Sequence, residues 1–95
     1  MRKLTKADIE LLINWGYSKD DITDIQDRLP YLRCYLYDDK NGSEVRINRK
    51  KAIELIGRYN FLSGLGRSTF HGTASRNIEG TSLSVSFDMS KYFRS

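Results

Sequence analysis

Several residue types that define common classes of small protein are scarce in this chain. Its 95 residues include one cysteine, one proline, one tryptophan and one histidine. A single cysteine, Cys34, excludes an internal disulfide framework, and Cys34 with His71 supplies too few ligands for a structural zinc site. We therefore expect no metal and no cofactor, and we expect Cys34 to be buried as a small apolar side chain.

Long apolar runs are also missing. The sequence has no run of about 18 apolar residues, so it predicts no membrane-spanning helix. Its first residues, MRKLTKADIE, become acidic and amphipathic before the apolar core of a signal peptide could form. The chain is long enough for one core only, and we expect a single domain, residues 1–95, in the cytoplasm.

Charge is plentiful and unevenly distributed along the chain. The formal net charge is +4. Residues 1–44 contain seven Lys or Arg against nine Asp or Glu, whereas residues 45–95 contain nine against three. Such asymmetry is typical of a protein with a basic surface for nucleic acid or an acidic partner. It is also found where the charge serves only solubility, and the sequence leaves both interpretations open.

Two short helices are expected in residues 1–30. Thr5 is followed three residues later by Asp8, and Ser18 by Asp21. A hydroxyl three positions before a carboxylate is typical of a helix N-terminus, where each side chain accepts a backbone N–H. The sequence therefore predicts a helical hairpin, and we expect it to pack on a sheet formed by the rest of the chain.

Strands are indicated by alternation of apolar and polar residues. Residues 31–37 and 44–47 alternate on either side of Asn41-Gly42, a strong signal for a β-hairpin. Residues 82–88 alternate again, with Ser82, Ser84 and Ser86 between apolar residues. These patterns predict a three-stranded, largely antiparallel sheet.

The stretch Tyr59–Arg76 is expected to form the helix around which the domain is built. Phe61, Leu62 and Leu65 keep helical spacing, and three glycines lie among them and beyond. Each glycine costs about 1 kcal/mol relative to alanine in a helix, so tertiary contacts must stabilise this one. We expect its small face to let other elements approach closely. A glycine-rich phosphate loop is the weaker alternative, because neither GxGxxG nor GxxxxGK[ST] is present.

A further helix, from Arg49 to Ile56, is expected between the hairpin and this stretch, with Asn48 as its N-cap and Gly57 at its end. Its first turn holds Arg49, Lys50 and Lys51, which oppose the helix dipole. Their placement indicates either an anionic partner or screening by carboxylates elsewhere in the chain.

The predicted order is therefore ααββααβ, an α+β domain with the sheet packed against helices. We expect one core, formed by Leu32, Cys34, Leu36, Val45, Ile47, Ile53, Ile56, Phe61, Leu65, Leu83, Val85 and Phe87. The other face of the sheet would carry tyrosines, arginines and serines, which can stack on bases and bind phosphates. Alternatively, the N-terminal helices cover that face and its tyrosines belong to the core.

Catalysis is not indicated. Ser68, His71 and Asp88 could form a nucleophile, base and carboxylate only if the fold brought them together, and a lone histidine on a packed helix is more often structural. The paired carboxylates Asp20-Asp21 and Asp38-Asp39 lack the ligand spacing of a calcium loop. We expect a binding protein and not an enzyme.

One segment resembles a known group of proteins. It comprises the helix RKKAIELIG, the string FLSG-x-x-RS-x-FH-x-TA-x-R from Phe61 to Arg76, and the end SFDMSKYF. It is similar to small proteins carried by phages and mobile elements of Gram-positive bacteria. The resemblance implies a small accessory protein, and well-studied proteins of that size and setting include anti-CRISPR inhibitors of type II effector nucleases.

Two functions follow as hypotheses. In the first, the chain is an inhibitor that binds a host defence nuclease or its guide-RNA complex and blocks DNA binding or cleavage. Its acidic contacts would be Asp20, Asp21, Asp24, Asp27, Asp38, Asp39 and Glu44. In the second, it is a DNA- or RNA-binding module. Its contacts would be Arg33, Tyr35, Tyr37, Arg46, Arg49, Lys50, Lys51, Arg58, Arg67 and Arg76.

Overall fold

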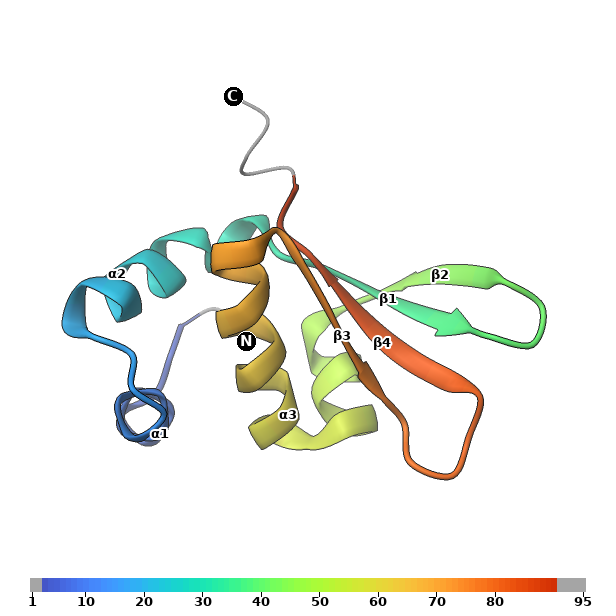
Figure 1. The fold of residues 1–95 in the computed structure, drawn as a ribbon, viewed down its shortest axis with the longest axis horizontal. Helices are drawn as coiled ribbons and strands as arrows, with labels where there is room; N and C mark the ends of the chain where they lie inside the picture. The colour runs from blue at the N-terminus through green and yellow to red at the C-terminus, as the bar shows by residue number, and fades with distance from the viewer. Residues whose placement is uncertain (1–2, 91–95) are drawn as a thin grey trace.

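The computed structural model describes residues 3–90 and shows a small α+β domain (Figure 1). Its elements are α1 (Lys6–Asn14), α2 (Lys19–Arg28), the 3-10 helix η1 (Leu29–Tyr31), β1 (Arg33–Asp38), β2 (Ser43–Ile47), α3 (Arg49–His71), β3 (Thr73–Asn77) and β4 (Leu83–Asp88). The α+β class is confirmed, but the order of helices and strands is ααββαββ and not ααββααβ.

The two N-terminal helices begin at the predicted caps. The N–H of Asp8 donates to Thr5 Oγ1 (3.2 Å), while the N–H of Thr5 donates to Asp8 Oδ2 (2.9 Å). Ser18 and Asp21 exchange the same pair of bonds. Each reciprocal pair of hydrogen bonds, called a capping box, satisfies two backbone N–H groups that would otherwise lack a partner at the start of a helix. The local sequence alone therefore fixes where α1 and α2 begin.

The sheet has four antiparallel strands in the order β2-β1-β4-β3, one strand more than predicted. The additional strand is β3, part of which lies within the stretch 59–76 that was expected to be helical. Gly72, at φ 90°, ends α3 in a backbone conformation that favours glycine. Only Ala74 and Arg76 of β3 lie on the same side as the buried residues of β4. The strand therefore lacks apolar alternation, and pairing with β4 defines it.

The span α3 contains both of the helices that were expected between β2 and the last strands. Asn48 caps it as predicted, accepting the N–H of Lys51 (2.7 Å). A kink lies at the predicted break, Gly57, where φ is 83° and ψ is 161°. This combination is essentially restricted to glycine. The chain thus changes direction at Gly57 without leaving helical structure on either side.

The small face of α3 makes the close contacts that were predicted for it. Phe61, Leu62 and Leu65 are buried. The backbone of Gly64 lies against the ring of Phe87, leaving no room for a Cβ atom, and Gly66 faces the hydroxyl of Tyr17 in the same way. Because Gly64 and Gly66 have no side chains, α3 can approach both β4 and the junction between α1 and α2 closely.

The core joins one face of the sheet to the helices. Of the predicted core residues, those buried are Leu32, Cys34, Phe61, Leu65, Val85 and Phe87, and those of intermediate burial are Leu36, Ile47, Ile53, Ile56 and Leu83. Val45 was predicted wrongly, because it lies on the edge strand β2 and is 60% exposed. The helices and chain ends extend the core beyond the prediction with Leu4, Leu12, Ile22, Ile25, Leu29, Ala52, Leu62 and Met89.

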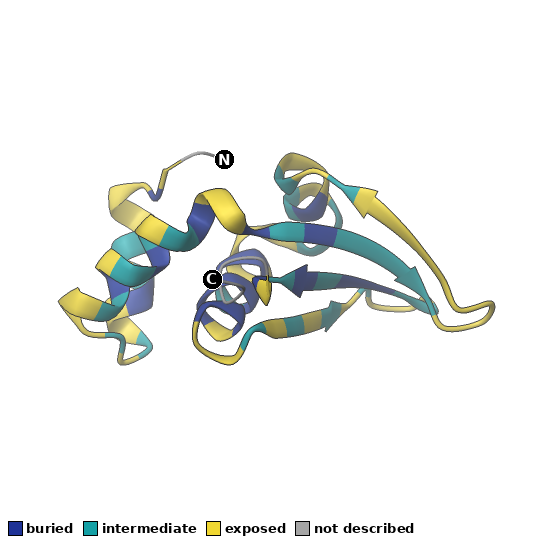
Figure 2. Ribbon diagram, turned by 90° about the horizontal axis from the view of Figure 1, so that it is seen from above, coloured by how far each residue is buried: buried dark blue, intermediate teal, exposed yellow. Residues whose placement is uncertain are grey.

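Within residues 3–90, helices cover one face of the sheet and leave the other face uncovered (Figure 1). In Figure 1, α3 lies against the sheet, and α1 and α2 lie at one end of the molecule beside α3. The contacts agree, because α1 and α2 pack mainly on α3 and α2 also on η1. Viewed from above in Figure 2, the strands extend away from the two N-terminal helices. The second face of the sheet is therefore a candidate binding surface.

Candidate functional site

The strand register shows which side chains share the uncovered face, here called the open face. Cys34, Val85 and Phe87 are buried toward α3, so the residues that alternate with them point the other way. The open face comprises three rows across the strands: Arg46, Tyr35, Ser86 and Ser75; Glu44, Tyr37, Ser84 and Asn77; and Arg33, Asp88 and Thr73. It is rich in hydroxyl groups and contains both signs of charge.

Tyr35 and Tyr37 are half-buried among these neighbours. The N-terminal helices, which were the alternative cover for them, pack on α3. Each ring has a charged side chain of β2 on one side and a short serine of β4 on the other, so its serine side is open to a ligand that lies on the sheet. The two tyrosines are therefore half-buried aromatic groups of the open face and lie outside the core cluster.

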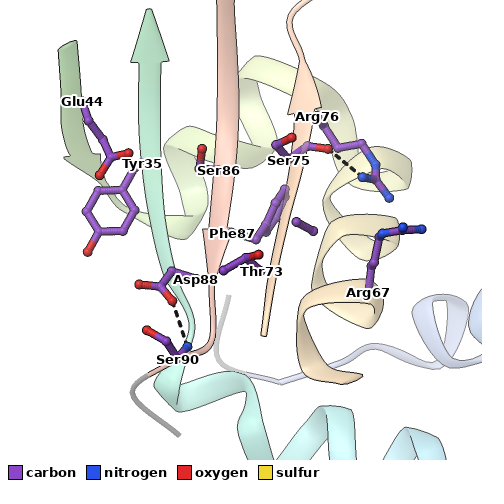
Figure 3. A pocket seen from close by; sticks show the side chains of 11 residues that line it. Tyr35, Glu44, Arg67, Thr73, Ser75, Arg76, Ser86, Phe87, Asp88 and Ser90 are labelled. Carbon is purple, nitrogen blue, oxygen red and sulfur yellow. Dashed lines mark hydrogen bonds between the residues drawn. The ribbon is translucent and has the colours of Figure 1, made fainter. Parts of the chain in front are cut away.

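A shallow depression of about 690 Å³ crosses the open face to the edge strand β3 (Figure 3). Its polar lining is Tyr35, Glu44, Arg67, Thr73, Ser75, Arg76, Ser86, Asp88 and Ser90. Residues from five different parts of the chain thus meet around one hollow. In Figure 3, Tyr35 and Glu44 lie at one side of it, and Arg67 and Arg76 lie at the other.

The arginine rim of the depression is partly fixed by hydrogen bonds. Arg76 donates from Nη2 to Ser63 Oγ (2.6 Å) and from Nη1 to the carbonyl of Ser75 (2.6 Å). Arg67 is exposed one turn before the end of α3. Both arginines also line a smaller pocket of about 210 Å³ with His71 and Phe70. Positive charge is therefore concentrated where α3 meets β3.

The remaining predicted basic residues divide into structural and exposed groups. Arg49 donates from Nη2 to the carbonyl of Leu29 (2.7 Å), joining α3 to η1. Arg58 forms an ion pair with Asp8. Lys50 and Lys51 are exposed in the first turn of α3. Arg33, Arg46 and Arg49 line a second pocket, of about 260 Å³, where β1 and β2 meet α3.

The ion pair between Arg58 and Asp8 joins α3 to α1. Arg58 Nε donates to Asp8 Oδ1 (2.6 Å), and its Nη2 donates to Oδ2 (2.6 Å). Asp8 is only 2% exposed. The bidentate hydrogen bonds from Arg58 hold the pKa of the Asp8 carboxyl below its usual value of 3.8, against the opposing effect of burial. The carboxylate also raises the pKa of Arg58. We therefore assign Arg58 a structural role.

The predicted acidic residues do not form one surface. Asp21 serves as a cap, and Asp38 accepts hydrogen bonds from the N–H of Lys40 and the hydroxyl of Ser82 (both 3.0 Å). Asp20, Asp24 and Asp27 belong to α2, whereas Asp38, Asp39 and Glu44 belong to the hairpin region. Figure 1 shows α2 and the β1–β2 turn at opposite ends of the molecule.

Two of the three groups considered for catalysis are engaged in local hydrogen bonds, and the third is exposed to solvent. Ser68 is fully buried, and its hydroxyl donates to the carbonyl of Leu65 (3.1 Å). His71 is exposed at the end of α3, and Asp88 accepts the N–H of Ser90 (2.8 Å). Burial raises the pKa of the Cys34 thiol to about 11, which keeps it protonated and unreactive at neutral pH.

Two further properties concern residues 3–90. Within this range, no three His, Cys, Asp or Glu side chains are grouped so that they could hold a metal ion. No helix there is both long and apolar enough to cross a membrane.

Comparisons with protein-family models, with curated proteins and with solved structures yield no match to this chain. The geometry of the site is therefore the basis for any functional assignment. Sequence reasoning identified Tyr35, Arg67 and Arg76 separately but missed Thr73 and Ser75, because it did not predict β3. The signal that could have located them is Gly72, because a glycine at the end of a helical segment commonly terminates the helix.

Proposed function

We propose that this chain is a non-catalytic binding protein that holds single-stranded nucleic acid across its open face. The observation that carries the proposal is the joint position of Tyr35, Arg67 and Arg76 around one depression. Proteins that bind single strands combine aromatic side chains, on which bases stack, with cations that follow the phosphates. Both kinds of group line the depression: Tyr35 lies on the open face, and Arg67 and Arg76 lie at the β3 edge, where α3 meets the sheet.

The charges that line the depression indicate how a single strand of nucleic acid would lie across it. Glu44 and Asp88 line the hollow together with Tyr35, and carboxylates repel phosphates. The sugar-phosphate backbone would therefore follow Arg67 and Arg76 along the β3 edge, and the bases would point inward toward Tyr35. Carboxylates accept hydrogen bonds from exocyclic amino groups of bases. We accordingly expect oligonucleotides rich in cytosine or adenine to bind better than oligothymidine or oligouridine.

The first prediction concerns affinity. Tyr35→Ala is expected to weaken binding to a short cytosine-rich strand by roughly 5- to 150-fold, because loss of one stacked base costs about 1–3 kcal/mol. Arg67→Ala and Arg76→Ala are each expected to weaken binding and to reduce the slope of log K against log salt by about 0.7. Fluorescence anisotropy titrations over a range of salt concentrations measure both effects.

Lys19→Ala is the matched control, since it removes an exposed cation from α2, away from the open face. It should leave affinity and salt slope nearly unchanged. The proposal would be contradicted by wild-type protein that binds no single strand at ~0.15 M salt. If Lys19→Ala and Arg67→Ala lowered the affinity equally, the interaction would be non-specific charge attraction.

We also propose, as a second candidate, an inhibitor carried by a mobile element that binds a nucleic-acid-handling defence protein in the bacterial cytoplasm. It is favoured by one feature of α2. Asp20, Asp24 and Asp27 are spaced by four and three residues, so their carboxylates lie along one side of the helix, one turn apart. A row of this kind is suited to a basic nucleic-acid channel on a partner.

The second prediction tests this inhibitor. The wild-type chain is expected to co-elute with a guide-loaded type II CRISPR effector and to reduce its DNA cleavage. Replacing Asp20, Asp24 and Asp27 by lysine should abolish both effects, because the new charges would repel the channel. Replacing Lys40, Lys50 and Lys51 by glutamate is the opposite charge change, and it should have little effect on co-elution. No co-elution of the wild type would exclude this target.

A further inference from the structure

The edge strand β2 has features of a self-pairing surface. Among the strands of residues 3–90 it pairs only with β1, and Ser43, Glu44, Val45 and Arg46 are all exposed. Val45 is 60% exposed and lies on the side of the sheet that packs against α3 elsewhere. An exposed strand edge with an uncovered apolar residue can add another strand through its backbone groups.

The direction of the backbone groups of β2 follows from a hydrogen bond on the other side of β1. The N–H of Asp39 donates to the carbonyl of Ser82 (3.0 Å), one position beyond the paired residues Asp38 and Leu83. Hydrogen-bonded and non-hydrogen-bonded pairs alternate along an antiparallel ladder. Tyr37 and Tyr35 therefore bond to β4, and Leu36 between them bonds to β2.

The partner of Leu36 on β2 is Val45. The N–H and C=O groups of Val45 consequently point toward β1. The same groups of Glu44 and Arg46, one residue to either side, point outward to the free edge. A strand that joins this edge must bond to Glu44 and Arg46 and must place a non-hydrogen-bonded residue opposite Val45.

We infer that the occupant of this edge is the β2 strand of a second copy of the chain, antiparallel and related by a two-fold axis at Val45. In this register, Glu44 of each copy lies opposite Arg46 of the other, and the two Val45 side chains meet at the axis. Both residues of each charged pair have the outward backbone groups that the pairing needs. The strand is thus complementary to itself in charge and in hydrogen bonding.

Other symmetric registers are less favourable. Moving the axis to Glu44 would place two glutamates opposite each other, and moving it to Arg46 would place two arginines opposite each other. Like charges directly opposite in a sheet are destabilising. An axis between two residues would oppose an outward-bonding residue to one whose groups point inward. Only the register centred on Val45 satisfies charge and backbone together.

The other edge of the sheet is less suited to pairing. The bond from the N–H of Ile78 to the carbonyl of Leu83 (2.9 Å) implies that Ile78, Arg76 and Ala74 bond to β4, so the groups of Ser75 point outward. The carbonyl of Ser75 already accepts a hydrogen bond from the guanidinium of Arg76 (2.6 Å). Dimerisation through β2 would therefore give one eight-stranded sheet, with β3 at both ends and the two open faces on the same side.

The third prediction is a pattern of charge dependence measured by sedimentation velocity over a range of concentrations. The wild type should show a concentration-dependent dimer. Glu44→Arg and Arg46→Glu should each be monomeric, because each creates two like-charge pairs across the axis. The double variant Glu44→Arg/Arg46→Glu should dimerise again. An equimolar mixture of the two single variants should form a heterodimer, because both of its cross-axis pairs join opposite charges.

A cross-link locates the axis independently. Residues in a non-hydrogen-bonded pair have Cα atoms about 4.5 Å apart, within the range that a disulfide spans. Val45→Cys should therefore form a disulfide dimer on mild oxidation, and Glu79→Cys, exposed in the β3–β4 turn, should not. Cys34 is 2% exposed and does not compete. A wild type that stays monomeric at every concentration, or a charge swap that fails to restore the dimer in a folded variant, would overturn the inference.

Discussion

Replacing Gly64 with alanine is expected to lower the free energy of unfolding by about 1–3 kcal/mol, the typical cost of overpacking a close-packed core. A methyl group at this position would lie 2.5 Å from Cζ and 2.7 Å from Cδ2 of Phe87. The ring of Phe87 is 1% exposed and packs edge-on against Phe61, with centroids 5.7 Å apart, so it has no free space to enter. Urea denaturation of the purified variant measures the effect.

The sign of this change is informative, because helix propensity alone predicts the opposite. Alanine in place of glycine within a helix is worth about 1 kcal/mol in stability. Gly66→Ala is the matched control: its methyl group would meet Tyr17 Oη at 2.6 Å, and Tyr17 is half-buried, so its ring tip can move. We expect a smaller loss there. A Gly64→Ala variant as stable as the wild type would mean that α3 does not lie against β4 as described.

Arg58→Ala is expected to destabilise the domain at neutral pH by about 1.5–3 kcal/mol, the usual worth of hydrogen bonds to a charged group. The substitution removes both donors from Asp8 and leaves a carboxylate that is 2% exposed without its cation. Removing the cation of an ion pair destabilises the fold strongly when the carboxylate left behind is buried. Arg67→Ala, which removes an exposed arginine from the same helix, should change stability little.

The pH dependence gives this prediction a second readout. The folded-state pKa of Asp8 lies below the ordinary value of 3.8. Its ion pair therefore stabilises the fold fully above pH ~4, and the stabilisation is lost as the pH falls through the lower folded-state pKa. The difference in stability between wild type and Arg58→Ala should consequently be largest near neutral pH and shrink below pH ~4. A difference that is constant from pH 7 to pH 3 would show that the loss comes from packing and not from charge.

Features decided by neighbouring residues could be predicted from the sequence. The caps at Thr5, Ser18 and Asn48 depend on side chains that reach backbone groups two or three residues away, and the residues involved define them. The β1–β2 hairpin and β4 follow from alternation and from Asn41-Gly42. A close contact of the glycine-rich helix could be predicted, because such a helix needs tertiary contacts to be stable. That Gly64 packs against Phe87 could not be predicted.

Features decided by distant residues could not be predicted. The strand β3 has little apolar pattern of its own, and it forms because Gly72 turns the chain back along β4. Val45 fits the alternation of a half-buried strand, yet β2 is an edge that α3 does not cover. The pairing of Asp8 with Arg58 joins residues 50 positions apart. In the site, Tyr35 and Arg76 come together only because β4 lies between β1 and β3.

The most direct test of the account is to map where a single strand contacts the protein. Two-dimensional amide NMR spectra of the full chain, titrated with a short cytosine-rich oligonucleotide, report this residue by residue. We predict that the largest shifts occur at Tyr35, Ser75, Ser86 and Arg67, around the depression, and that α1 and α2 change little. Shifts confined to α2, or no shifts with saturating oligonucleotide, would contradict the assignment of the open face as a nucleic-acid-binding surface.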